Sequence, residues 1–124
     1  MLKKFVLYLC VMNAVVTLLT GCQQNTTVPH QLIGTWKTNA PEYADRYIRI
    51  DEYFLVFGVG DGVDVTNYIQ NIDEKDKPNG TLYTIRYKDP EEEKWDLKFI
   101  YSPADGGVIR LQNKEELWRM QKQE

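Results

Sequence analysis

The side chains that could do acid–base or metal chemistry in this sequence of 124 residues are 18 Asp and Glu, two Cys and one His. The single histidine, His30, follows Pro29 in a polar stretch without periodicity, where nothing fixes it as a base or a metal ligand. Carboxylates gather in two charged runs, residues 73–77 and 89–93, which are typical of solvated turns. We therefore predict no enzyme, no metal site and no cofactor.

A glycine-rich run, Gly58-Val59-Gly60-Asp61-Gly62-Val63-Asp64, has the composition of a phosphate or calcium loop. It lacks the lysine and the following helix of a phosphate loop, and the glutamate that completes an EF-hand. We expect a hairpin turn in which glycines supply positive φ angles. If the flanking strands close into a barrel, this turn lies at one end, which makes four of its residues candidates for the border of a ligand-binding mouth: Gly58, Gly60, Asp61 and Gly62.

The first 22 residues carry the most specific pattern in the chain. Lys3 and Lys4 precede an apolar segment, residues 5–19, which has signal-peptide length and is shorter than the about 20 residues of a spanning helix. It ends in Leu19-Thr20-Gly21-Cys22, which resembles the lipobox of bacterial lipoproteins. The resemblance implies that residues 1–21 are a cleaved signal peptide and that the thiol of Cys22 takes a diacylglycerol.

Acylation of Cys22 would attach the protein to a membrane, because each buried CH₂ of an acyl chain contributes about 0.8 kcal/mol. It would also leave no free thiol for a nucleophile or a zinc site. Gln23 after the cysteine resembles the outer-membrane sorting signal, so we expect the cell envelope: the outer membrane of a Gram-negative cell, otherwise the cell membrane. The alternative is an uncleaved anchor helix with an incidental cysteine.

The polar residues 22–31 predict a flexible linker between this tether and a folded domain. The formal charge is −3, and removal of Lys3 and Lys4 with the signal peptide leaves 13 basic against 18 acidic residues, or −5. No stretch offers the basic face that phosphate binding requires, so we expect no nucleic-acid partner.

From Leu32 to Glu124 the chain alternates apolar and polar residues between short turn signals. In residues 94–101, for example, Trp95, Leu97 and Phe99 share one face and the lysines share the other. This pattern predicts an all-β domain, a small eight-stranded antiparallel up-and-down barrel. The predicted strands are Gly34–Thr38, Arg46–Asp51, Tyr53–Val59, Val63–Asp73, Leu82–Lys88, Lys94–Tyr101, Val108–Gln112 and Leu117–Gln121.

Large side chains supply enough volume to fill most of such a barrel, which leaves a shallow open end as the expected pocket. The side chains that we predict inside are Trp36, Tyr47 or Ile48, Phe57, Tyr68, Tyr83, Ile85, Tyr87, Trp95, Leu97, Phe99 and Trp118.

The segment Gly34-Thr35-Trp36-Lys37 resembles the Gly-x-Trp signature at the first strand of lipocalin and calycin barrels. The resemblance implies that Gly34 permits the tight start of the strand, that Trp36 closes the barrel floor, and that Arg119 packs over Trp36 as a cation–π pair. The domain from Leu32 has 93 residues, fewer than a full lipocalin, and shows no helical lid.

Together these features predict a membrane-anchored envelope lipoprotein whose lipocalin-like barrel binds a small apolar ligand or an envelope protein. The partner surface would be the strand Tyr53–Val59, which is apolar on both faces over residues 53–57. The alternative is a structural or assembly accessory lipoprotein with a solid barrel and no ligand.

Overall fold

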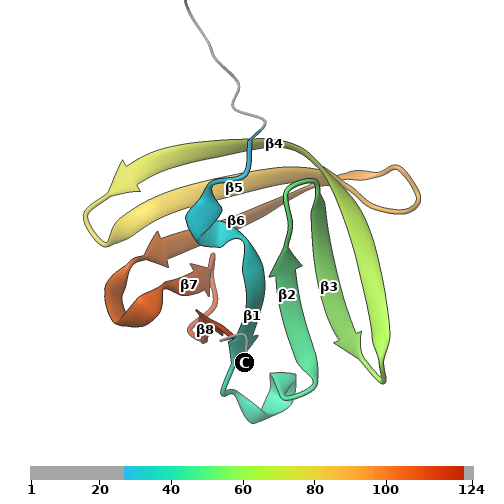
Figure 1. Cartoon of the computed structure of the whole chain (residues 1–124), viewed down its shortest axis with the longest axis horizontal. Helices are drawn as coiled ribbons and strands as arrows, with labels where there is room; N and C mark the ends of the chain where they lie inside the picture. Colours follow the sequence, from blue (N-terminus) through green and yellow to red (C-terminus); the bar gives the residue numbers. More distant parts are fainter. Residues whose placement is uncertain (1–26, 122–124) are drawn as a thin grey trace, which may run out of the picture.

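The computed structural model describes residues 27–121, which form a closed barrel of eight antiparallel strands (Figure 1). Each strand pairs with the next along the chain, and the last pairs with the first. This confirms the predicted all-β up-and-down architecture. The strands are β1 (Gly34–Thr38), β2 (Arg46–Ile50), β3 (Phe54–Gly60), β4 (Val63–Lys77), β5 (Gly80–Lys88), β6 (Lys94–Ser102), β7 (Val108–Leu111) and β8 (Leu117–Met120).

Three short 3₁₀ helices, η1 (His30–Leu32), η2 (Pro41–Tyr43) and η3 (Ala104–Gly106), lie outside the strands. Because consecutive strands run in opposite directions, the connections divide between two ends of the barrel. One end holds η1, η3 and the β2–β3 and β4–β5 turns. The other holds η2, the β3–β4 and β5–β6 turns and the β7–β8 connection.

The first of these ends is closed by the segment that precedes β1. The side chains of Val28 and Leu32 are 4% and 0% exposed, and the indole Nε1 of Trp36 donates a hydrogen bond of 3.0 Å to the carbonyl of Leu32. Gln31 donates a hydrogen bond of 2.8 Å to the hydroxyl of Tyr83. Residues 28–31, which we predict as the end of a flexible linker, therefore contact the barrel through the buried side chain of Val28 and the hydrogen bond of Gln31.

The long hairpin of β4 and β5 extends beyond its predicted bounds. Backbone pairing continues from Asp73 opposite Thr84 to Lys77 opposite Gly80, around a two-residue turn at Pro78-Asn79. Residues 73–77 are exposed, so their charged side chains reach water while their backbone pairs with β5. The charged composition of residues 73–77 is typical of a turn, but pairing with β5 makes them part of a strand.

A register shift in β4 between Ile69 and Asn71 changes which residues face the core. Before it the odd-numbered Asn67 is buried, and after it the even-numbered Ile72 is buried. Tyr68 precedes the shift and, next to the buried Asn67, lies on the outward face, where it is 56% exposed, so its predicted place in the core is wrong.

Trp95 is also wrongly predicted as core. It shares the inward face of β6 with Leu97 and the buried Phe99, but its side chain is 51% exposed. Trp95 stands beside the β5–β6 turn, where β6 extends past the packed interior. Of the alternatives at β2, Ile48 is buried and Tyr47 is not.

The predicted signal peptide, residues 1–21, and the predicted lipidation site Cys22 lie outside the described residues. Within residues 27–121, no helix has the length and apolar character needed to span a membrane.

Candidate functional site

An apolar pocket of about 250 Å³ lies at the end of the barrel opposite η1, and we call it the open-end pocket. Ile48 of β2 and Phe57 of β3 form a cross-strand pair on its wall. The β6, β7 and β8 strands and η2 complete the apolar lining with Leu97, Leu111, Trp118 and Tyr43.

The interior between this pocket and η1 is filled by side chains. Trp36, Tyr83, Ile85 and Phe99 are each at most 1% exposed, and the rings of Tyr83 and Phe99 have centroids 5.7 Å apart. Burial, with the nearby Glu74 carboxylate, raises the pKa of Tyr83, so its hydroxyl stays neutral where it accepts the bond from Gln31. The pocket is therefore shallow and confined to the open end.

Charged side chains border the open-end pocket. Arg46, Lys114 and Glu116 belong to its lining. The guanidinium of Arg46 lies 5.9 Å from the centroid of the Tyr43 ring, which in turn packs at 5.9 Å against Trp118. This stack holds η2 against the mouth. We did not predict it, although an arginine three residues after a tyrosine, shortly after Pro41, is a visible local signal.

The structure brings only part of the predicted glycine turn to the pocket. Gly58 lines it, whereas Gly60, Asp61 and Gly62 are not among the lining residues. The turn has positive φ angles, 56° at Asp61 and 72° at Gly62, as expected for a hairpin.

Gly58 has a second role, because the ring of Tyr47 packs across it from the neighbouring strand. A Cβ atom at position 58 would overlap that ring. The Tyr47 hydroxyl reaches past Gly58 and donates a hydrogen bond to the carboxylate of Asp64, and this bond raises the pKa of Tyr47. One aromatic side chain thus connects β2, β3 and β4 beside the pocket.

The residues of the Gly-x-Trp segment lie at the closed end. Met120 packs against the backbone at Gly34, where an added Cβ would lie 2.9 Å from its Sδ atom. Trp36 is fully buried and meets Tyr101 edge-on, with ring centroids 6.3 Å apart.

Arg119 does not pack over Trp36, so that expectation is wrong. Arg119 is exposed and stands opposite Lys37 on β1, while the adjacent Trp118 is buried inside the barrel. Strand alternation therefore directs Arg119 outward. The cation–π contact found within residues 27–121 is that of Arg46 with Tyr43.

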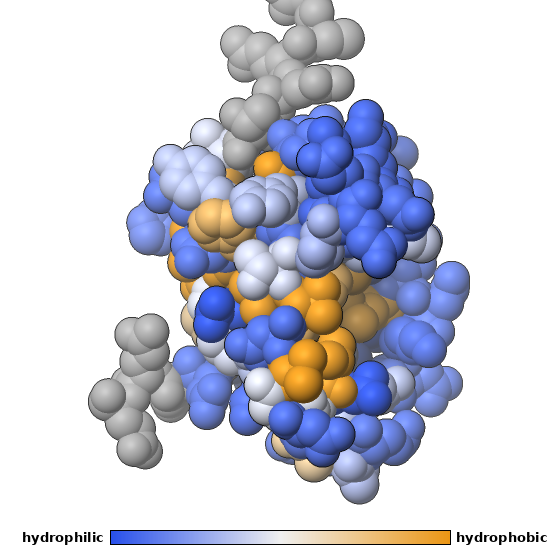
Figure 2. Space-filling view, turned by 90° about the vertical axis from the view of Figure 1, so that its right-hand side faces the viewer, coloured by the Kyte–Doolittle hydropathy of each residue, from blue (hydrophilic) through white to orange (hydrophobic). Residues whose placement is uncertain are grey.

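The strand that we predict as a partner surface exposes apolar side chains chiefly at its ends. Tyr53 is 65% and Val59 is 42% exposed, but Leu55 and Val56 between them are buried. Phe54 packs against Tyr68 with ring centroids 5.4 Å apart. Figure 2 views the side on which the β3–β4 and β5–β6 turns lie, where apolar residues gather in the middle with polar residues around them.

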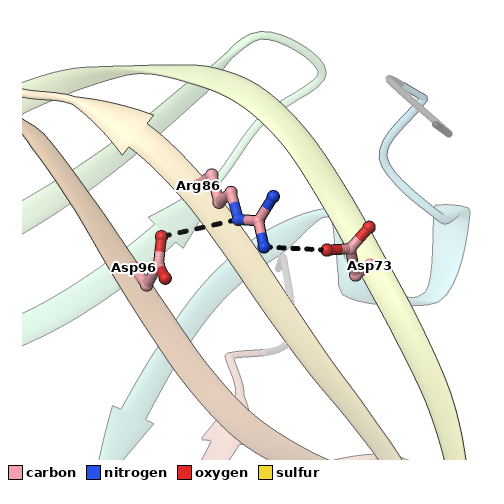
Figure 3. A network of polar contacts seen from close by, with 3 residues as sticks. All are labelled: Asp73, Arg86 and Asp96. Atoms are coloured by element: carbon pink, nitrogen blue, oxygen red, sulfur yellow. Dashed lines mark ion pairs between the residues drawn. The ribbon is translucent and has the colours of Figure 1, made fainter.

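The main polar network on the outer wall joins three strands. Arg86 of β5 lies 3.5 Å from Asp73 of β4 and 3.8 Å from Asp96 of β6 (Figure 3). All three side chains are about half exposed, so solvent screens these ion pairs and each contributes little to stability. The arrangement is that of a paired sheet surface, with no carboxylate pair facing a cavity.

The described part of the chain contains no group of three or more His, Cys, Asp or Glu residues placed to hold a metal ion. Comparisons of the chain with models of protein families, with curated proteins and with solved structures found no match.

Proposed function

We propose that this protein is a membrane-anchored lipoprotein of the bacterial cell envelope, and that its lipocalin-like barrel binds a small apolar ligand in the open-end pocket. The observation that carries the proposal is a 250 Å³ pocket walled by Ile48, Phe57, Leu97 and Trp118 at an accessible end of the barrel. An apolar cavity of about 150 Å³ in another protein is enough to bind benzene. The ligand is thus a compact molecule or one end of a longer chain.

The anchor proposed at Cys22 would orient the barrel. Five residues separate Cys22 from Val28, the first buried residue of the described part, and six fully extended residue steps span at most about 20 Å. An acyl group on Cys22 would therefore keep the η1 end near the bilayer. The open-end pocket would face away from the lipid, so its ligand would enter from the aqueous side.

Ligand binding is tested with N-phenyl-1-naphthylamine, an apolar probe whose fluorescence rises in an apolar site. The wild-type chain is expected to bind it. Leu97→Trp fills the pocket and should weaken binding at least tenfold, whereas Leu117→Trp, at an exposed position on β8 outside the pocket lining, should leave it unchanged. Equal probe binding by both variants would contradict the assignment of the pocket.

The anchor is tested by metabolic labelling of cells with a palmitate analogue. Wild type and Cys22→Ala are compared, and Cys10→Ala in the apolar segment is the matched control. Label is expected in wild type and in the control but not in Cys22→Ala. Equal labelling of all three chains would remove the lipoprotein proposal while leaving the pocket untouched.

A second candidate is a structural or assembly accessory that carries no ligand. The side chains of Trp36, Tyr83 and Phe99 favour it, because they fill the interior and leave a pocket smaller than the roughly 300–1,000 Å³ usual for ligand sites. Native mass spectrometry of the protein extracted from envelopes separates the two. An apolar molecule that stays bound to the protein favours ligand binding. A protein that carries no ligand and also fails to bind the probe favours the accessory role.

A further inference from the structure

The first part of β4 has a neighbour on one side only. Its residues from Val63 to Tyr68 pair with β3, but its pairing with β5 begins at Tyr68, which stands opposite Lys88. Beyond Lys88 the chain turns away into the β5–β6 connection and returns as β6. We call residues 63–67 of β4 the β4 edge; Figure 1 shows this part of β4 rising beside β3.

The backbone groups that this edge offers follow from the hydrogen-bond alternation of antiparallel strands. Ile69 N donates a bond of 2.9 Å to the carbonyl of Tyr53 on the β3 side, so odd-numbered residues of this part of β4 bond to β3. The N–H and C=O groups of Asp64 and Thr66 consequently point away from β3. Both residues are exposed, so these groups form a row available for a further strand.

The surroundings of the β4 edge specify what kind of strand would fit. Val63 and Tyr68 at its two ends are 52% and 56% exposed, and Trp95 on the nearby hairpin is 51% exposed. By strand alternation Val63 shares the inward face with Trp95, and the two offer apolar contacts to alternate residues of an added strand, whereas Tyr68 lies on the outward face.

Charge restricts the strand further. The β5–β6 turn carries three consecutive glutamates, Glu91, Glu92 and Glu93, all exposed. The turn follows Lys88, which places it beside the Tyr68 end of the β4 edge. A strand antiparallel to β4 begins at that end, so a lysine or arginine near its N-terminus would meet the glutamates.

We propose that the β4 edge binds an extended peptide segment of a partner protein, which adds to the sheet as an antiparallel strand. The segment has apolar residues at alternate positions and a basic residue at its N-terminal end. It occupies the line along which β5 would have continued. This proposal is independent of acylation and of the open-end pocket.

The experiment uses the full chain in dodecylmaltoside and the fluorescently labelled peptide Lys-Val-Thr-Val-Thr-Val, with binding followed by anisotropy. Thr66→Pro removes an N–H that points outward and leaves the pairing with β3 intact. Thr66→Ala keeps that N–H and is the matched control. We expect binding by wild type and Thr66→Ala, and at least a tenfold loss in Thr66→Pro.

Two further measurements keep the proposal falsifiable if Thr66→Pro unfolds. Peptide binding to wild type should slow hydrogen exchange of the Asp64 and Thr66 amides. Replacing all three glutamates of the turn by glutamine should weaken binding of the lysine peptide. The same replacement should not affect a peptide in which glutamine stands in place of the lysine. The proposal is overturned if wild type does not bind the peptide, if bound peptide leaves the two amides unprotected, or if the edge instead pairs two copies of the chain.

Discussion

Trp36 joins the first strand to the segment that closes the barrel. Its side chain is fully buried, it meets Tyr101 edge-on, and its indole N–H binds the carbonyl of Leu32 in the η1 segment. The burial of Trp36 could be predicted from its place in an alternating strand. Its hydrogen bond could not, because that bond depends on a segment that we expected to be flexible.

We expect Trp36→Ala to lower the free energy of unfolding by about 3–5 kcal/mol, since it leaves a large cavity at the closed end. Trp36→Phe leaves a smaller cavity but loses the hydrogen bond to Leu32. We expect it to lower the free energy of unfolding by about 1 kcal/mol or more. Urea unfolding of both variants measures these losses. A near-neutral Trp36→Ala would mean that this end is not the stable part of the barrel.

Asp89 organises the β5–β6 turn and provides a pH test. Its carboxylate accepts hydrogen bonds of 2.9 Å from Trp95 Nε1 and from the backbone N–H groups of Glu91 and Glu93, and these bonds lower its pKa from the ordinary 3.8. The folded pKa is thus below the unfolded one. The stabilisation is therefore fully present above pH 3.8 and is lost as the pH falls through the lower folded value.

We expect the indole N–H resonance of Trp95 to shift as the pH falls, with a midpoint below 3.8. Nuclear magnetic resonance of the full chain follows this titration. Asp89→Ala should remove the transition. A midpoint above 3.8 would show that the hydrogen bonds to the carboxylate do not persist in solution.

At the scale of elements, Tyr47 and Gly58 hold β2 and β3 in register beside the pocket. The ring of Tyr47 lies where a Cβ of residue 58 would be. We expect Gly58→Ala to cost about 1–3 kcal/mol, as overpacking commonly does, and to cost much less when Tyr47→Ala is already present. A double-mutant cycle by urea unfolding measures this coupling, and additive effects would show that the clash is relieved without cost.

The elements also show where local sequence stops being informative. The eight strands could be predicted because alternation and turn residues are local signals. The ends of β4 and β5 could not, since Asp73 to Lys77 have turn-like composition and become a strand through pairing with β5. Tyr68 lies outside because the odd-numbered residues of β4 face the core up to Ile69, and the shift that reverses the faces comes only after it.

For the whole molecule, the two ends of the barrel differ in packing. The closed end is sealed by Leu32 and Trp36, whereas the open end holds the apolar pocket and the unpaired β4 edge. In native-state hydrogen exchange, we expect the amides around Ile85, on a strand paired on both sides, to exchange only by global unfolding. The amide of Thr66 should exchange far faster. Similar rates at both positions would show that the β4 edge is as well protected as the strand around Ile85.

The sequence by itself determined that the domain is an antiparallel β barrel, that the inward faces of β5 and β6 are apolar, and that Trp36 is buried. These properties follow from alternation within single strands, which neighbouring residues specify. Only the tertiary structure decided which end is closed, that Arg119 points outward, that Arg46 packs on Tyr43, and that β4 keeps a free edge. Those properties depend on the register between strands, and register is set by contacts between residues far apart in the chain.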